Sequence, residues 1–94
     1  TETPAVLRAP SAGARPLTRG AALSRESRAR SLAARGRVAL ANGRYDAAYA
    51  YFDDATELDP ESGTAWRGFG TAAYQLGHRA EARRAIRRAR ALGD

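Results

Sequence analysis

The sequence of 94 residues contains no cysteine, no lysine and no methionine, and it has one tryptophan and one histidine. Without cysteine, the chain has no disulfide framework and no cysteine-based metal site. The single histidine, His78, has no second histidine or cysteine at ligand spacing, so we expect neither a metal centre nor a histidine general base. No cofactor is predicted.

Long apolar runs are also missing. No stretch approaches the roughly 18 apolar residues that suggest a membrane-spanning helix. There is no signal-peptide pattern, and the first residue is threonine, so we expect the chain to be trimmed, processed or part of something longer. The lack of cysteine is compatible with both cytosol and periplasm. We predict a cytoplasmic protein, with the periplasm as the alternative.

The charge is basic but unevenly distributed. All sixteen basic residues are arginine, and the formal net charge is +6. Residues 1–44 hold nine arginines and two acidic residues, residues 45–61 hold six acidic residues and no arginine, and residues 62–94 hold seven arginines and two acidic residues. Because an acidic segment lies between two basic ones, the sequence argues against one uniform surface for binding a polyanion.

The chain divides into an arm and a helical part. Residues 1–17 carry three prolines among alanine, glycine, serine and arginine, which predicts a flexible or extended arm. Residues 18–94 predict helices over about 24–41, 45–58, 63–76 and 79–92, with residues 18–28 as a candidate extension of the first. Glycine at 43, 77 and 93 and Asp59-Pro60 end these helices, and the short connections make neighbouring helices antiparallel.

The helical part contains an internal repeat. A shift of 34 residues superimposes three kinds of position: helix-ending glycines, small residues and large apolar residues. The pairs are Gly36 with Gly70, Gly43 with Gly77, Leu32 with Trp66, Phe52 with Ile86, Leu58 with Leu92, and Ala39, Ala48 and Ala55 with Ala73, Ala82 and Ala89. Each match falls where two helices must touch or where the chain must turn.

This pattern resembles the tetratricopeptide repeat family, over about two thirds of the chain. Repeat one covers residues 29–62 and repeat two residues 63–94. The resemblance implies an all-α fold of two antiparallel helix-turn-helix hairpins, stacked as a short right-handed solenoid after the arm. Arg35 departs from the family pattern, which has a large apolar residue there, and Ala39 and Ala73 replace an aromatic residue.

Residues 45–58 hold four of the seven aromatic residues of the chain. On a helical wheel the aromatic and alanine side chains fall on one half, and Asp46, Asp53, Asp54 and Glu57 fall on the other. We therefore expect the aromatic residues in the core, together with Trp66, and the acidic residues in water. We also expect this acidic strip to lie beside the arginines of the last helix.

The resemblance implies a protein-interaction module rather than an enzyme, with a concave ligand surface formed by the first helix of each repeat. The predicted partner-binding residues are Arg30, Arg37, Leu40, Arg67, Thr71, Tyr74 and Gln75. The arginines are suited to the carboxylates of a peptide, helix or partner subunit. Repeat one has no asparagine on this face, which argues against a clamp for a C-terminal carboxylate. The layout also resembles the C-terminal end of larger bacterial signalling or scaffold proteins.

Two alternatives stay open. One is self-association into a homo-oligomer through the last helix, which has no following helix to cover it; Arg84, Arg87 and Arg88 would form that assembly face. The other is nucleic-acid binding through RRAIRRARA, residues 83–91, which is disfavoured because its apolar residues have helical spacing. Binding to phosphates would weaken steeply with salt. No arrangement of serine, histidine and carboxylates supports catalysis.

Overall fold

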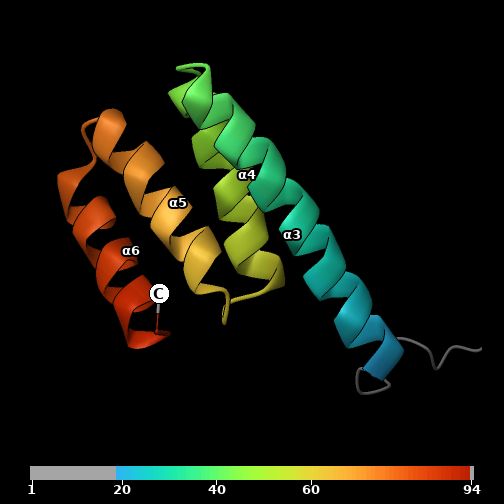
Figure 1. The fold of residues 1–94 in the computed structure, drawn as a ribbon. Helices are drawn as coiled ribbons and strands as arrows, with labels where there is room; N and C mark the ends of the chain where they lie inside the picture. The colour runs from blue at the N-terminus through green and yellow to red at the C-terminus, as the bar shows by residue number, and fades with distance from the viewer. Residues whose placement is uncertain (1–18, 94) are drawn as a thin grey trace, which may run out of the picture.

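The computed structural model describes residues 19–93, and these residues form four α-helices (Figure 1). The helices are α3 (Arg19–Ala41), α4 (Tyr45–Leu58), α5 (Gly63–Gln75) and α6 (Arg79–Ala91). Residues 19–93 contain no strand, so the prediction of an all-α fold of helical hairpins is confirmed. The predicted arm, residues 1–17, lies outside the described residues. The first helix includes the candidate extension from residue 19 onward.

The turns that close the two hairpins have the same geometry. Gly43 and Gly77 both adopt positive φ angles, 74° and 87°, which side chains disfavour. The next residue donates its backbone N–H to a carbonyl five positions back in both turns: Arg44 to Ala39 at 2.8 Å, and His78 to Ala73 at 2.9 Å. The repeat seen in the sequence is therefore a repeat of backbone conformation.

The four helices form two hairpins that pack side by side. Helix α3 packs on α4 and α5 packs on α6, while α5 also contacts α4 and, less extensively, α3. Figure 1 shows α5 between α4 and α6, and the N-terminal part of the long α3 projecting past the end of α4. Helix α5 therefore joins the hairpins, and a groove separates α4 from α6.

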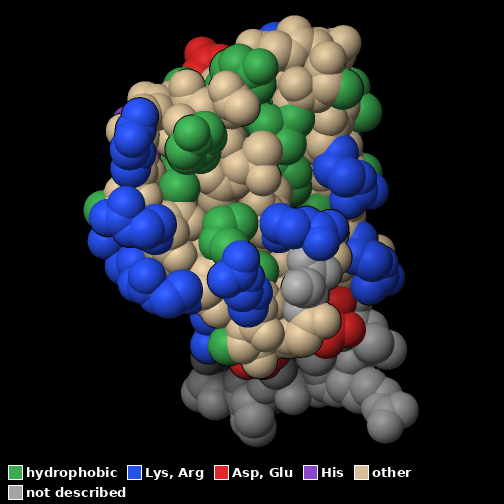
Figure 2. Space-filling model, turned by 60° about the vertical axis from the view of Figure 1, so that its left-hand side comes forward, with side chains coloured by type: hydrophobic (Ala, Val, Ile, Leu, Met, Phe, Trp, Pro, Cys, Tyr) green, Lys and Arg blue, Asp and Glu red, His purple; other side chains and the backbone are tan. Residues whose placement is uncertain are grey.

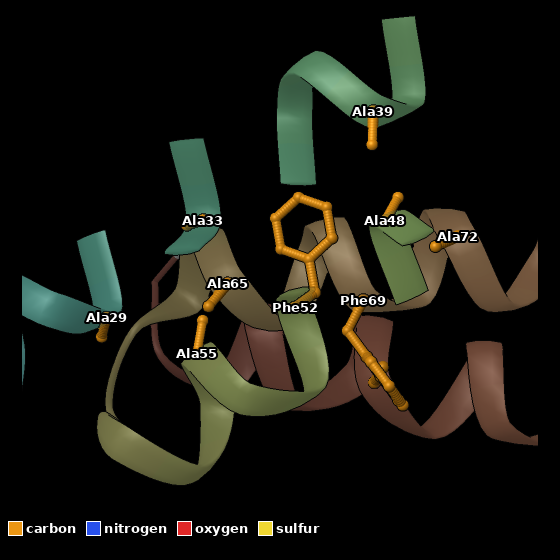
Figure 3. Close-up of a cluster of buried hydrophobic side chains, with 10 residues drawn as sticks. Ala29, Ala33, Ala39, Ala48, Phe52, Ala55, Ala65, Phe69 and Ala72 are labelled. Atoms are coloured by element: carbon orange, nitrogen blue, oxygen red, sulfur yellow. The ribbon is translucent and has the colours of Figure 1, made fainter. Parts of the chain in front are cut away.

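The core is made largely of alanine, which lets the helices approach closely. Apart from Phe52 and Phe69, the buried apolar side chains of the described residues are all alanine. The Phe52 side chain is 1% exposed and points from α4 toward α3 (Figure 3). Two glycines make room for it: a Cβ atom on Gly36 of α3 or on Gly68 of α5 would lie under 3 Å from ring atoms of Phe52.

The aromatic residues of α4 face inward as predicted. Phe52 is buried, the three tyrosines of α4 are half-buried, and the acidic side chains of α4 are exposed. Trp66, predicted as a core residue, is instead half-buried at the margin of the core. Its indole N–H reaches the Pro60 carbonyl at 2.9 Å, and its ring meets Phe69 edge-on. The Pro60 carbonyl therefore satisfies the indole N–H at the margin of the core.

Among the described helices, none is both long enough and apolar enough to cross a bilayer.

Candidate functional site

The predicted concave surface lies where α3 and α5 run beside each other. Arg30 and Arg37 are two helical turns apart, so they project from one side of α3, and both are exposed. They line one groove together with Thr64 of α5, and Arg37 lines a second, adjacent groove. Arg67 also lines the second groove, as do Leu40 and Thr71. We call these two grooves the α3/α5 face.

The α3/α5 face offers guanidinium groups for binding. Within residues 19–93, neither Arg30 nor Arg37 has an ion-pair partner. One carboxylate, that of Asp59, lines the first groove, and it accepts a hydrogen bond from the backbone N–H of Glu61 at 3.2 Å. Guanidinium groups in this arrangement can each donate paired hydrogen bonds to a carboxylate. The half-buried Leu40 adds an apolar contact in the second groove.

Two predicted partner-binding residues lie elsewhere. Tyr74 is 59% exposed near the end of α5, and it lines a groove between α5 and α6 rather than the α3/α5 face. The Arg79 guanidinium lies 6.0 Å from the centre of its ring, within reach of a cation–π interaction. Gln75 is exposed and follows it. The predicted set therefore extends over two adjoining surfaces of the protein, which share Thr71.

The groove between α5 and α6 is apolar inside and basic around its edge. We call it the end groove, because it lies on the side of this hairpin that no other described helix covers. It has a volume of about 670 Å³ and is lined by Gly70, Thr71, Tyr74, Arg79, Ala82, Arg83, Ile86, Arg87 and Arg90. Figure 2 brings the α6 side of the molecule forward and shows arginine side chains around apolar ones, with acidic side chains near the edges.

The predicted assembly face is divided as well. Arg87 lines the end groove, whereas Arg84 and Arg88 line the groove between α4 and α6, whose floor includes Trp66 and Phe69. The five arginines of residues 83–91 therefore lie on two sides of α6.

The acidic residues of α4 and the arginines of α6 face one another across the groove between these helices. Asp53 and Glu57 line one side of it, and Arg84 and Arg88 line the other. Within the described part of the chain, no ion pair joins an arginine of α6 to an acidic residue of α4, and Arg88 is instead 3.9 Å from Glu61 in the connection before α5. The expected neighbouring strips are therefore separated by an open groove.

A polar cluster that the sequence did not reveal ties α4 to the start of α6. The Tyr49 hydroxyl donates to Glu81 Oε1 at 2.8 Å, and His78 Nδ1 lies 3.3 Å from the same oxygen. The hydrogen bond to Glu81, burial, and the carboxylates of Glu81 and Asp53 together raise the pKa of Tyr49. Tyr49 and Glu81 are 32 residues apart, and no spacing rule pairs them. The cluster joins two helices whose backbones do not meet.

Comparison of the chain with known protein families agrees with the repeat found in the sequence. Two family models, both described as tetratricopeptide repeat, match residues 39–93 and residues 11–63 of the chain. No curated protein matches the chain.

Proposed function

The chain belongs to the tetratricopeptide repeat family, whose repeats generally mediate protein–protein interactions, and from that premise we propose that it is a scaffold or adaptor module. Its α3/α5 face binds an acidic peptide, helix or partner subunit. Arg30, Arg37 and Arg67 contact carboxylates, and Leu40 and Thr71 contact the adjoining part of the ligand.

The observation that carries this proposal is the pair Arg30 and Arg37. Two guanidinium groups on one side of a helix, both exposed and without an ion-pair partner within residues 19–93, add little to the stability of the fold. Their positions flank a groove that continues onto α5. A ligand with carboxylates about two helical turns apart, roughly 10 Å, would satisfy both groups at once.

Peptide selection tests this proposal without a known partner. A displayed library of random peptides is selected on the intact chain and, in parallel, on the Arg30→Glu/Arg37→Glu/Arg67→Glu variant. We expect the unaltered chain to enrich peptides rich in Asp and Glu, and the variant to lose that enrichment. The matched control is Arg35→Glu/Arg44→Glu/Arg84→Glu, which changes the net charge equally but alters exposed arginines outside the α3/α5 face.

Circular dichroism and thermal melting of each variant separate loss of binding from loss of fold. Enrichment of acidic peptides by all three proteins would contradict the proposal, because net basic charge would then be sufficient. Selection of peptides without acidic residues by the unaltered chain would contradict it as well.

A further inference from the structure

The end groove is the second copy of a surface that is already occupied in the first repeat. Gly70, Tyr74 and Ile86 of the end groove correspond to the residues 34 positions earlier in the sequence. These are Gly36, Leu40 and Phe52. In the first repeat, α5 covers that surface. Leu40 and Phe52 line one groove together with Gly68 and Thr71 of α5.

Ile86 and Phe52 each pack on a glycine of their own repeat, but only Phe52 is also covered on its opposite side. Ile86 packs on Gly70 so closely that a Cβ atom there would lie 2.9 Å from Ile86 Cδ1, as Phe52 packs on Gly36. Phe52 is covered on its other side by Gly68 of α5. No described helix covers Ile86 in this way, and its side chain is only half-buried. The end groove thus has the shape of a seat for one more helix.

The edge of the end groove differs in charge from its counterpart. Arg83 takes the place of Tyr49, and Arg87 takes the place of Asp53. In the first repeat these positions face the aromatic residues of α5, because Tyr49 stacks on Phe69 at 4.8 Å and Asp53 lines a groove with Trp66. A helix seated on the end groove in the manner of α5 would present its equivalents of Trp66 and Phe69 to two guanidinium groups.

We infer that the end groove binds an amphipathic α-helix of a protein partner, with a glycine or alanine over Ile86 and acidic residues facing Arg83 and Arg87. This surface adjoins the α3/α5 face at Thr71 but is otherwise lined by different residues, so it gives the module a second binding site. The small residue allows close approach of the helix backbone, as Gly68 does at Phe52. The acidic residues neutralise the two arginines that border the groove.

A second copy of the chain fits the end groove poorly. If α3 of another copy occupied the seat in the manner of α5, Ala34 would lie at the position of Gly68, but Arg35 would lie at the position of Phe69. Arg35 would then approach Arg83 and Arg87, and like charges brought together oppose association. A symmetric contact between two end grooves would bring the same arginines together.

A designed helix serves as the probe. The peptide has the sequence of residues 60–77 with Trp66→Glu and Phe69→Glu, and with Gly70→Lys and Tyr74→Asp joined as a lactam, since an isolated helix of this length is marginal in water. In the protein, Gly70 and Tyr74 line the groove between α5 and α6, on the side of α5 away from Gly68, so the bridge lies away from the docking side. A second peptide carries Arg at positions 66 and 69. Each is labelled with fluorescein, and its binding to the intact chain is measured by anisotropy.

We expect the acidic peptide to bind about ten-fold tighter than the basic one, from two favourable contacts in one and two repulsive contacts in the other. Arg83→Glu/Arg87→Glu reverses that preference. The matched control Arg84→Glu/Arg88→Glu, on the other side of α6, preserves it. The Arg30→Glu/Arg37→Glu/Arg67→Glu variant preserves it too, so failure at the end groove and failure at the α3/α5 face are distinguishable.

Three results would overturn the inference. The first is that neither peptide binds up to its solubility limit. The second is that Arg83→Glu/Arg87→Glu leaves the preference unchanged. The third is a concentration-dependent dimer in sedimentation velocity that Ile86→Glu dissociates, because a second copy would then occupy the groove.

Discussion

The ring of Phe52 on α4 occupies the space directly over Gly68 of α5, where a Cβ atom would lie 2.3 Å from ring atom Cε1. The same ring lies against Gly36 of α3, so one side chain is held between the two hairpins. Because the other buried apolar residues in the described part of the chain are almost all alanine, this contact supplies much of the core packing.

Gly68→Ala is expected to destabilise the protein although alanine favours helix. The propensity gain is about 1 kcal/mol, whereas overpacking a buried site costs about 1–3 kcal/mol. Because the Phe52 ring is buried and lies against glycines on both sides, we expect a net loss at the upper end of that difference, about 1–2 kcal/mol. Urea denaturation measures it. In a Phe52→Leu background Gly68→Ala should become neutral or stabilising, and equal costs in both backgrounds would refute the contact.

Phe52→Ala and Ile86→Ala occupy equivalent positions but should differ in cost. Phe52 is covered on both sides, so its truncation is expected to cost about 3–5 kcal/mol. Ile86 is half-buried beside the open end groove, so its truncation is expected to cost about 1–2 kcal/mol. Both values come from chemical denaturation of the intact chain. Equal losses would show that Ile86 is already covered.

Tyr49→Phe tests the cluster that joins α4 to α6. The raised pKa of Tyr49 in the folded state means that its stabilising effect is complete below about pH 10, the ordinary tyrosine pKa, and is lost as the pH rises through the raised pKa. At neutral pH Tyr49→Phe should lose about 1 kcal/mol from the hydrogen bond to Glu81. The gap in the free energy of unfolding between the unaltered chain and Tyr49→Phe should narrow above pH 10. A gap that widens there would contradict the sign of the pKa shift.

Two substitutions of Trp66 separate the contribution of its ring packing to stability from that of its hydrogen bond. Trp66→Phe keeps an aromatic ring beside Phe69 and removes only the bond to the Pro60 carbonyl, so the expected cost is about 0.5–1.5 kcal/mol. Trp66→Ala is expected to cost about 2–3 kcal/mol, less than a buried tryptophan would, because the indole is only half-buried. Thermal melting followed by circular dichroism compares the two. Equal costs would assign the whole contribution to the hydrogen bond.

Much of the fold could be predicted because its signals are local or periodic. Glycine at positions 43 and 77 fixed the two hairpin turns, and the 34-residue shift placed Phe52 and Ile86 at helix contacts. Helical periodicity placed the aromatic residues of α4 inside and its acidic residues outside. These are properties of single helices and their ends, which the sequence states directly.

The surfaces were harder to predict because they depend on how far apart packed helices lie. The sequence placed the arginines of α6 beside the acidic residues of α4, but the two helices do not contact each other, and the groove between them is lined by aromatic side chains of α5. The 34-residue repeat did not single out Gly68, because the corresponding residue of the first repeat is Ala34. In the structure, Gly68 lies against Phe52. The bond between Tyr49 and Glu81 depends on the same separation of helices.

The most direct measurement is an NMR titration of the intact, isotope-labelled chain with the most enriched acidic peptide, following the side-chain Nε–H signals of the arginines. We predict that the signals of Arg30, Arg37 and Arg67 shift together, with one dissociation constant. Those of Arg35, Arg44 and Arg84 should stay in place. Shifts confined to arginines outside the α3/α5 face, or spread evenly over all of them, would contradict the binding surface proposed for this protein.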